Sequence, residues 1–157
     1  MAPKLLGFLD RDAIVTELEA ATKDEAIREL VAFAAKRGLI DAKHESAIAE
    51  GVLERERKGT TGLGDGIAVP HVKEHPHVKA LCGAFGRSKE GIPFEAVDGK
   101  KVHLIFLILG AKGTAAEHIG ILKRLASLRQ NEYFLRFLRD AKDKAAIGDV
   151  IEEMAVA

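Results

Sequence analysis

The sequence is poor in several residue types whose presence would point to particular classes of protein. Cys82 is the only cysteine among 157 residues, which excludes an internal disulfide and any zinc or iron–sulfur site built from several cysteines. There is no tryptophan, and aromatic residues make up only 5% of the chain. Lysine plus arginine equal aspartate plus glutamate at 24 each, so the bulk charge does not favour a nucleic acid, an anionic membrane or a strongly acidic partner.

Long hydrophobic runs are also missing. The longest, LIFLIL at 104–109, is far shorter than the ~18 residues that would suggest a membrane span. The N-terminal stretch MAPKLLGFLDRDA has too short an apolar run for a signal peptide. We therefore expect a cytoplasmic protein with no stable membrane insertion, folded as a single domain over residues 1–157.

Helix signals are clear in the first third of the chain. Thr22 and Glu25 have the spacing of a capping box, and the apolar residues that follow them share one helical face. Gly38 marks the end of this helix. A second helix is predicted to begin at Asp41 and to end in the charged stretch ERERKG.

Helices are predicted again in the last third. Thr114 and Glu117 repeat the capping-box spacing at the start of TAAEHIGILKRLASL, whose apolar residues also fall on one face. Two further helices are predicted near 131–140 and 143–154.

The middle of the chain favours strands. Short apolar runs bounded by glycine, proline or charged residues predict strands at 66–71, 80–87 and 102–109. The last run is apolar on both faces, which is typical of a central strand covered by helices on both sides. The predicted fold class is therefore α/β, a single domain with a central mixed sheet flanked by helices.

The stretch GTTGLGDGIAVPHVKEHPH, residues 59–77, contains four of the glycines and three of the histidines. A nucleotide-binding P-loop is disfavoured, because that motif needs Gly-Lys-Ser/Thr at the start of a helix and a strand follows here. A plain turn is one interpretation of the glycines. Another is a backbone that points several N–H groups at an anion such as a phosphoryl group.

The histidines differ in their surroundings. His75 and His77 are predicted to be solvated loop residues and not metal ligands, because Pro76 breaks the strand geometry and few other ligands are nearby. His71 directly follows a rigid proline at the end of an apolar strand, where a sheet delivers side chains to the rim of a site. His118 faces inward from the first turn of its helix, which on its own is typical of a buried core histidine.

Three segments taken together resemble one family. They are VLERERKGTTGLGDGIAVPH at 52–71, KVHLIFLILG at 101–110 and EHIGILKRLASL at 117–128. They resemble the enzyme IIA domains of the fructose/mannitol type, or type 2, of the bacterial phosphoenolpyruvate-dependent phosphotransferase system, which include a nitrogen-regulatory branch. The resemblance covers nearly the whole chain and implies the fold of the mannitol-type enzyme IIA.

The resemblance implies a site of three residues. His71 would be the phosphorylated residue, His118 would lie beside it, and Arg55 would be its cationic neighbour. A neutral imidazole is nucleophilic at physiological pH, and a guanidinium can stabilise the negative charge of a phosphoryl group in transfer. If both rings touch one phosphoryl group, their side chains should lie ~4–7 Å apart. The scheme requires no metal and no other cofactor.

The function implied by the resemblance is that of a phosphotransferase component, a phosphohistidine carrier. His71 would accept the phosphoryl group from the small carrier protein HPr or its nitrogen-branch counterpart. In a regulatory role, phosphorylation would then decide which target proteins are bound; in a transport role, the group would pass to a cysteine of a separate enzyme IIB. The regulatory role is slightly favoured, because no IIB or membrane domain is attached. A non-phosphorylated binding module on the same fold is a further alternative.

Overall fold

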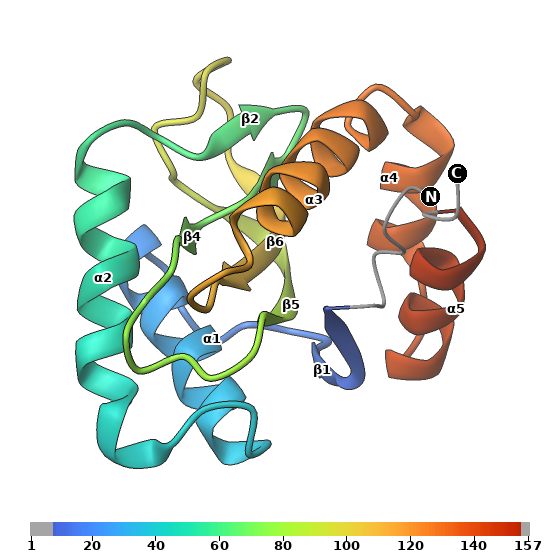
Figure 1. The fold of residues 1–157 in the computed structure, drawn as a ribbon. Coiled ribbons are helices and arrows are strands. Elements are labelled where there is room, and N and C mark those ends of the chain that lie inside the picture. Colours follow the sequence, from blue (N-terminus) through green and yellow to red (C-terminus); the bar gives the residue numbers. More distant parts are fainter. Residues whose placement is uncertain (1–7, 155–157) are drawn as a thin grey trace.

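A six-stranded mixed sheet forms the centre of the molecule (Figure 1). The computed structural model describes residues 8–154, so residues 1–7, which include part of the apolar N-terminal run, and 155–157 lie outside the described residues. The strands run in the order β1-β5-β6-β3-β2, and β4 also pairs with β6. Their bounds are β1 Leu9–Val15, β2 Gly62–Gly64, β3 Ile67–Ala68, β4 His71–Val72, β5 Cys82–Ile92 and β6 Val102–Leu109.

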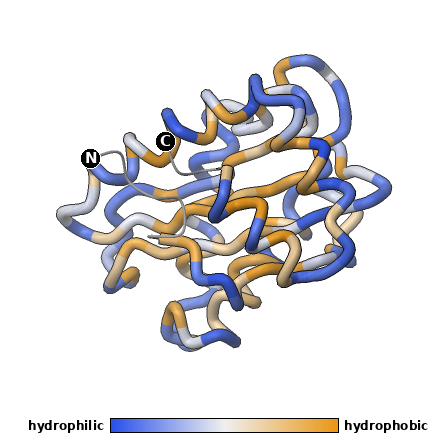
Figure 2. The backbone as a smooth tube through the Cα atoms, turned by 90° about the vertical axis from the view of Figure 1, so that its right-hand side faces the viewer, coloured by the Kyte–Doolittle hydropathy of each residue, from blue (hydrophilic) through white to orange (hydrophobic). Residues whose placement is uncertain are grey.

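β6 is the central strand, as the sequence predicted. It pairs antiparallel with β5 and parallel with β3 and β4, and every residue in it except His103 is buried. Figure 2 shows hydrophobic residues concentrated in the strands at the middle of the molecule. Because successive side chains of a strand point to opposite faces, β6 contributes to two separate cores. Leu104, Phe106 and Ile108 belong to one, and Ile105, Leu107 and Leu109 belong to the other.

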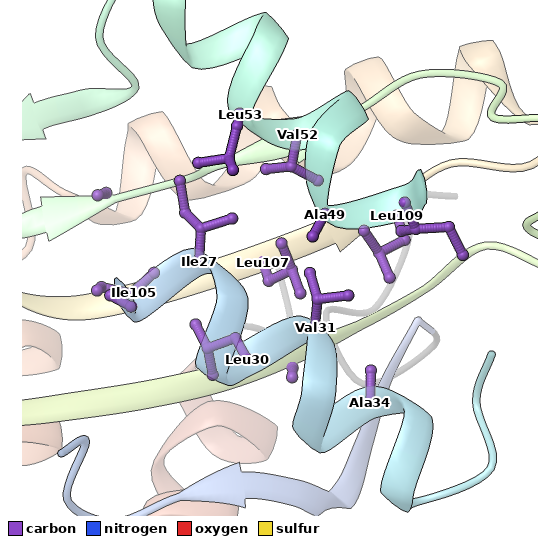
Figure 3. Close-up of a cluster of buried hydrophobic side chains, with 14 of the residues drawn as sticks. Ile27, Leu30, Val31, Ala34, Ala49, Val52, Leu53, Ile105, Leu107 and Leu109 are labelled. Carbon is purple, nitrogen blue, oxygen red and sulfur yellow. The ribbon is translucent and has the colours of Figure 1, made fainter. Parts of the chain in front are cut away.

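Helices α1 (Lys23–Lys36) and α2 (Glu45–Arg57) cover one face of the sheet. Figure 3 shows their apolar side chains meeting those of β6. The capping box predicted at the start of α1 is confirmed, because Thr22 accepts a hydrogen bond from the Glu25 backbone N–H and Glu25 accepts one from Thr22. The labelled residues of this core are Ile27, Leu30, Val31, Ala34, Ala49, Val52, Leu53, Ile105, Leu107 and Leu109.

Helices α3 (Ala115–Leu128), α4 (Glu132–Asp140) and α5 (Lys144–Met154) supply the second core on the opposite face. The helices predicted near 131–140 and 143–154 are therefore confirmed. Asn131 caps α4 by accepting hydrogen bonds from the backbone N–H groups of Tyr133 and Phe134. None of the helices within residues 8–154 is both long enough and apolar enough to cross a membrane.

Two predicted helix starts are wrong in detail. Asp41 caps a short 3₁₀ turn, Ala42–His44, and α2 begins only at Glu45. The second capping box is absent: the Thr114 hydroxyl donates to the Ala111 carbonyl at 2.6 Å and so turns back toward the preceding loop instead of capping α3.

The predicted strands also need correction. The single strand expected at 66–71 is split into β3 and β4, because Pro70 has no N–H and the Val69 N–H donates to Thr61 instead of to β6. β5 begins at Cys82 and continues to Ile92, beyond the predicted 80–87. β1 and β2 were not predicted. The α/β class with a mixed central sheet is confirmed.

Candidate functional site

The candidate site lies where β4 runs beside the end of β6. His71 is the first residue of β4 and is paired with Ile108, one residue before the last of β6. Its side chain is buried with the core and is not displayed in a loop. The chain turns at Gly110 directly after β6 and soon begins α3, which brings the start of that helix to the same end of the sheet.

The His71 ring is held in one tautomer. Its Nδ1 lies 2.8 Å from the carbonyl oxygen of Val69, and a carbonyl can only accept, so Nδ1 carries the hydrogen. Burial lowers the pKa of His71, and the positive charges of Arg55 and Lys73 lower it further. The ring is therefore neutral at physiological pH and has its free lone pair on Nε2, which is the form that can act as a nucleophile.

His118 lies against this ring. The two ring centroids are 5.2 Å apart with an interplanar angle of 69°, inside the predicted range. His118 is only 1% exposed, and neither of its ring nitrogens has a hydrogen-bond partner among residues 8–154. Burial lowers its pKa to about 4, and the pKa is lowered further by the charge of Lys73 and by the charge that His71 carries when it is protonated. Leaving a buried polar group unpaired costs about 1–3 kcal/mol, which marks this position as one that a bound polar group would complete.

Gly110 makes the approach of the two rings possible. A Cβ at this position would lie 2.6 Å from Nδ1 of His118, closer than non-bonded atoms can come. The Gly110 N–H donates to the Val72 carbonyl at 2.8 Å, and its own carbonyl accepts from the His75 N–H at 2.9 Å. Gly110 thus ties the segment after β4 to the end of β6 while leaving room for the imidazole. The sequence reasoning missed it, and its only signal was a glycine ending the apolar run LIFLIL.

Two cations act on the histidine pair. Arg55 lies near the end of α2, where its Nη1 donates to the Gly59 carbonyl at 2.9 Å. Its charge lowers the pKa of His71. Lys73, which the sequence reasoning missed, is exposed two residues after His71, and its charge lowers the pKa of both histidines.

The backbone N–H groups of the glycine-rich turn bear on its second interpretation, as an anion-binding backbone. Gly62 and Gly64 belong to β2, which folds back antiparallel on β3. The Gly62 N–H donates to the Thr60 hydroxyl at 3.1 Å, and the Asp65 N–H donates to the Asp98 carboxylate at 3.0 Å. The interpretation of the turn as a cradle of free N–H groups is wrong for these two groups, because both are already paired.

The remaining candidates lie apart from the pair. His75 and His77 gather with His44, the residue directly before α2, where the His44 and His77 ring centroids stack at 3.7 Å. No group of three or more histidine, cysteine, aspartate or glutamate side chains within residues 8–154 has an arrangement that could hold a metal ion. Burial raises the pKa of the Cys82 thiol to about 11, so this thiol stays protonated and is a poor nucleophile.

Comparison with known proteins decides the family. Residues 7–154 match the family model described as "Phosphoenolpyruvate-dependent sugar phosphotransferase system, EIIA 2". The chain belongs to this family of enzyme IIA domains. The resemblance inferred from the three sequence segments is therefore confirmed.

The relatives of this enzyme IIA domain carry two kinds of name. A nitrogen regulatory protein of Bradyrhizobium diazoefficiens is 37% identical over 140 residues, which cover 89% of each chain. The fructose-specific EIIABC component of Bacillus subtilis is 34% identical over 150 residues, which cover 96% of this chain but only 23% of that longer protein. The crystal structure of nitrogen regulatory protein IIA-Ntr from Neisseria meningitidis has a TM-score of 0.83 and 29% identity, covering 92% of this chain and 97% of that one.

Proposed function

We propose that this enzyme IIA domain is a phosphocarrier that accepts a phosphoryl group on Nε2 of His71 from an HPr-like carrier protein. The observation that supports it best is the hydrogen bond from Nδ1 of His71 to the Val69 carbonyl, which leaves the Nε2 lone pair of a neutral ring free. A fixed tautomer keeps this lone pair available on one nitrogen, which is what nucleophilic attack on a phosphorus atom needs.

The transfer step makes one bond and breaks one. The Nε2 lone pair forms a new P–N bond to the phosphorus while the bond between that phosphorus and its donor breaks, and the electron pair of the broken bond returns to the donor. The hydrogen on Nδ1 stays in its bond to Val69. The positive charge that the ring gains is offset by the negative phosphoryl oxygens and by this carbonyl.

His118 and Arg55 would stabilise the group in transfer. With its pKa lowered to about 4, His118 is neutral and has one N–H that can donate to a phosphoryl oxygen. His118 lies in the first turn of α3, where the helix dipole favours negative charge. Arg55 adds a full positive charge from the α2 side.

The regulatory role is the one we favour. Its support is that the nitrogen regulatory protein of Bradyrhizobium diazoefficiens aligns over 89% of its own length, and that the Neisseria nitrogen regulatory protein has the same fold. The transport role is the second candidate, because a fructose-specific component is 34% identical. Mixing the phosphorylated protein with the fructose-type enzyme IIB of its own organism separates the two: rapid loss of phosphate to the IIB cysteine supports transport.

Phosphoryl uptake is the test of the proposal itself. The protein is incubated with phosphoenolpyruvate, enzyme I and the matching HPr-like carrier, and its intact mass is measured before and after mild acid. We expect one phosphoryl group, labile in acid and stable in base, and none on a His71→Ala variant. An unmodified wild-type protein, or the same acid-labile group on His71→Ala, would reject His71 as the carrier and favour a binding module on this fold.

A further inference from the structure

A buried carboxylate, that of Glu56, is not one of the residues to which a role in the transfer step has been given. Glu56, next to Arg55 in the last turn of α2, is only 6% exposed. A charge removed from water is unfavourable unless hydrogen bonds and an opposite charge compensate it. Each oxygen of Glu56 is compensated: Oε1 accepts from the Thr61 hydroxyl at 2.6 Å, and Oε2 accepts from the Thr61 N–H at 2.8 Å and from Nζ of Lys23 at 3.1 Å.

The contacts of Glu56 lead to His71 through the backbone. Thr61, held by both its hydroxyl and its N–H, accepts a hydrogen bond on its own carbonyl from the Val69 N–H at 3.0 Å. The carbonyl of the same Val69 receives the Nδ1–H of His71 at 2.8 Å. Each contact in this series is a hydrogen bond of ordinary length. Every residue in the series except Lys23 is buried.

This series of hydrogen bonds explains why the Val69 carbonyl points at His71. Val69 and Pro70 lie between β3 and β4, so neither belongs to a strand. The Val69 N–H bonds to Thr61, and Pro70 has no N–H to donate. The Thr61 carbonyl therefore holds the Val69 N–H on one side of the peptide whose carbonyl faces His71, and the Ile108 N–H holds the Pro70 carbonyl on the other side at 3.0 Å. Thr61 is in turn held by Glu56.

We propose that Glu56 is a positioning residue for phosphoryl transfer: through Thr61 and Val69, its carboxylate holds the carbonyl that keeps the hydrogen of His71 on Nδ1. The proposal rests on the function proposed above for its consequence in catalysis. The control of the His71 tautomer by Glu56 can be measured without any phosphoryl transfer. Glu56 takes no proton in this role, since its oxygens are occupied by Thr61 and Lys23.

The test begins with a substitution that keeps the shape and removes the charge. Glu56→Gln has one carbonyl oxygen in place of two carboxylate oxygens, so it cannot accept from all three donors. Two-bond ¹H–¹⁵N NMR spectra of the unphosphorylated protein report the His71 tautomer directly. We expect a single Nδ1–H tautomer in the wild type and a mixture in Glu56→Gln, with phosphoryl uptake slowed roughly tenfold to a hundredfold because the nucleophile is misplaced.

The control is Glu54→Gln, which removes a carboxylate from an exposed position of the same helix. It should keep the wild-type tautomer and uptake rate. A second pair of variants tests the hydrogen bond between Thr61 and Glu56. Thr61→Val deletes the hydroxyl that donates to Oε1 of Glu56 and should give mixed His71 tautomers. Thr61→Ser keeps a hydroxyl and should keep the single tautomer. This pair decides the matter if Glu56→Gln does not fold.

The result that overturns the proposal is a Glu56→Gln or Thr61→Val protein that melts at a lower temperature yet keeps the single Nδ1–H tautomer and the wild-type uptake rate. Glu56 would then serve stability alone. If the wild-type protein takes up no phosphoryl group, the proposed function fails, but the NMR comparison still supports or rejects the control of the tautomer by Glu56.

Discussion

The molecule contains two close pairs of histidine rings in contrasting surroundings. His71 and His118 meet edge to face at 5.2 Å inside the protein. His44 and His77 lie closer, with ring centroids at 3.7 Å and an interplanar angle of 4°, but His77 is exposed and His44 only partly buried. The closer pair is thus the one that water can reach.

The contrast teaches that the spacing of two rings says little about chemistry. Water can solvate the exposed His77 ring of the stacked pair, whereas both nitrogens of His118 are buried without a partner among the described residues. In the buried pair, the tautomer of the His71 ring is also fixed by the Val69 carbonyl. Burial that leaves hydrogen-bonding capacity unused is therefore the better signal of a site.

The largest effect expected from this contrast is the pH dependence of stability. The pKa of His118 is about 4 in the folded protein against an ordinary 6.5, so between these values the unfolded chain binds a proton that the folded one does not. Stability should therefore fall as pH drops from 6.5 to 4, by about 3 kcal/mol from this group, and level off below. Urea unfolding across this range should show a shallower dependence for His118→Gln, and equal slopes would contradict the burial argument.

The next effect is on transfer. His118→Ala removes the N–H expected to bind a phosphoryl oxygen, so uptake should slow roughly a hundredfold. Its free energy of unfolding should change less, because the substitution also removes two unpaired buried nitrogens. His77→Ala is the matched control from the stacked pair and should transfer at the wild-type rate. Equal rates for the two variants would leave His118 as a core histidine.

A smaller effect is expected at Gly110. In Gly110→Ala the new methyl group must displace the His118 ring, which should destabilise the protein by about 1–3 kcal/mol and slow uptake about tenfold. Gly59→Ala serves as the control, because a Cβ there meets open space. Thermal melting and uptake rates measured on both variants test the prediction, and a Gly110→Ala protein that behaves like Gly59→Ala would refute it.

The smallest effect belongs to the stacked pair. Since His77 is exposed, His77→Ala should change the free energy of unfolding by no more than about 0.5 kcal/mol. The pKa of His44 is lowered by desolvation and by the neighbouring charge of His77. An NMR titration should therefore show the His44 pKa rising toward its ordinary value in His77→Ala. An unchanged His44 pKa would mean that the two rings do not interact in solution.

The sequence predicted the elements whose signals are local. The capping box of Thr22 and Glu25 identifies a helix start from four adjacent residues, and the run of apolar residues in β6 identifies a strand buried on both faces. Both predictions are confirmed. β1 could not be found this way, because three exposed residues follow Leu9 and a register shift before Ile14 removes the alternation that identifies a strand. Thr114 has the same sequence spacing as Thr22, but its hydroxyl is occupied by the loop before it, which no local pattern reveals.

The site was predictable only in part. The inward direction of His118 follows from helical periodicity, and its partnership with His71 came from the family resemblance. The links through Thr61 and Val69 could not be predicted, because they use backbone groups whose directions depend on how β2, β3 and the loop after β3 pair. The role of Gly110 could not be predicted for a related reason. It depends on the His118 ring, which is eight residues away in the sequence and is brought close only by the fold.

The two cores on opposite faces of the sheet have one further consequence. Arg55 and Glu56 come from α2 on one face, His118 comes from α3 on the other, and His71 comes from the sheet between them. Neither helical layer contains the whole site. A partly unfolded molecule that keeps only one helical layer on the sheet therefore lacks either Arg55 and Glu56 or His118 at the site. If His71 carries the phosphoryl group as proposed, a chain that has lost one layer should transfer none at all, because it has lost at least one of these side chains from the site.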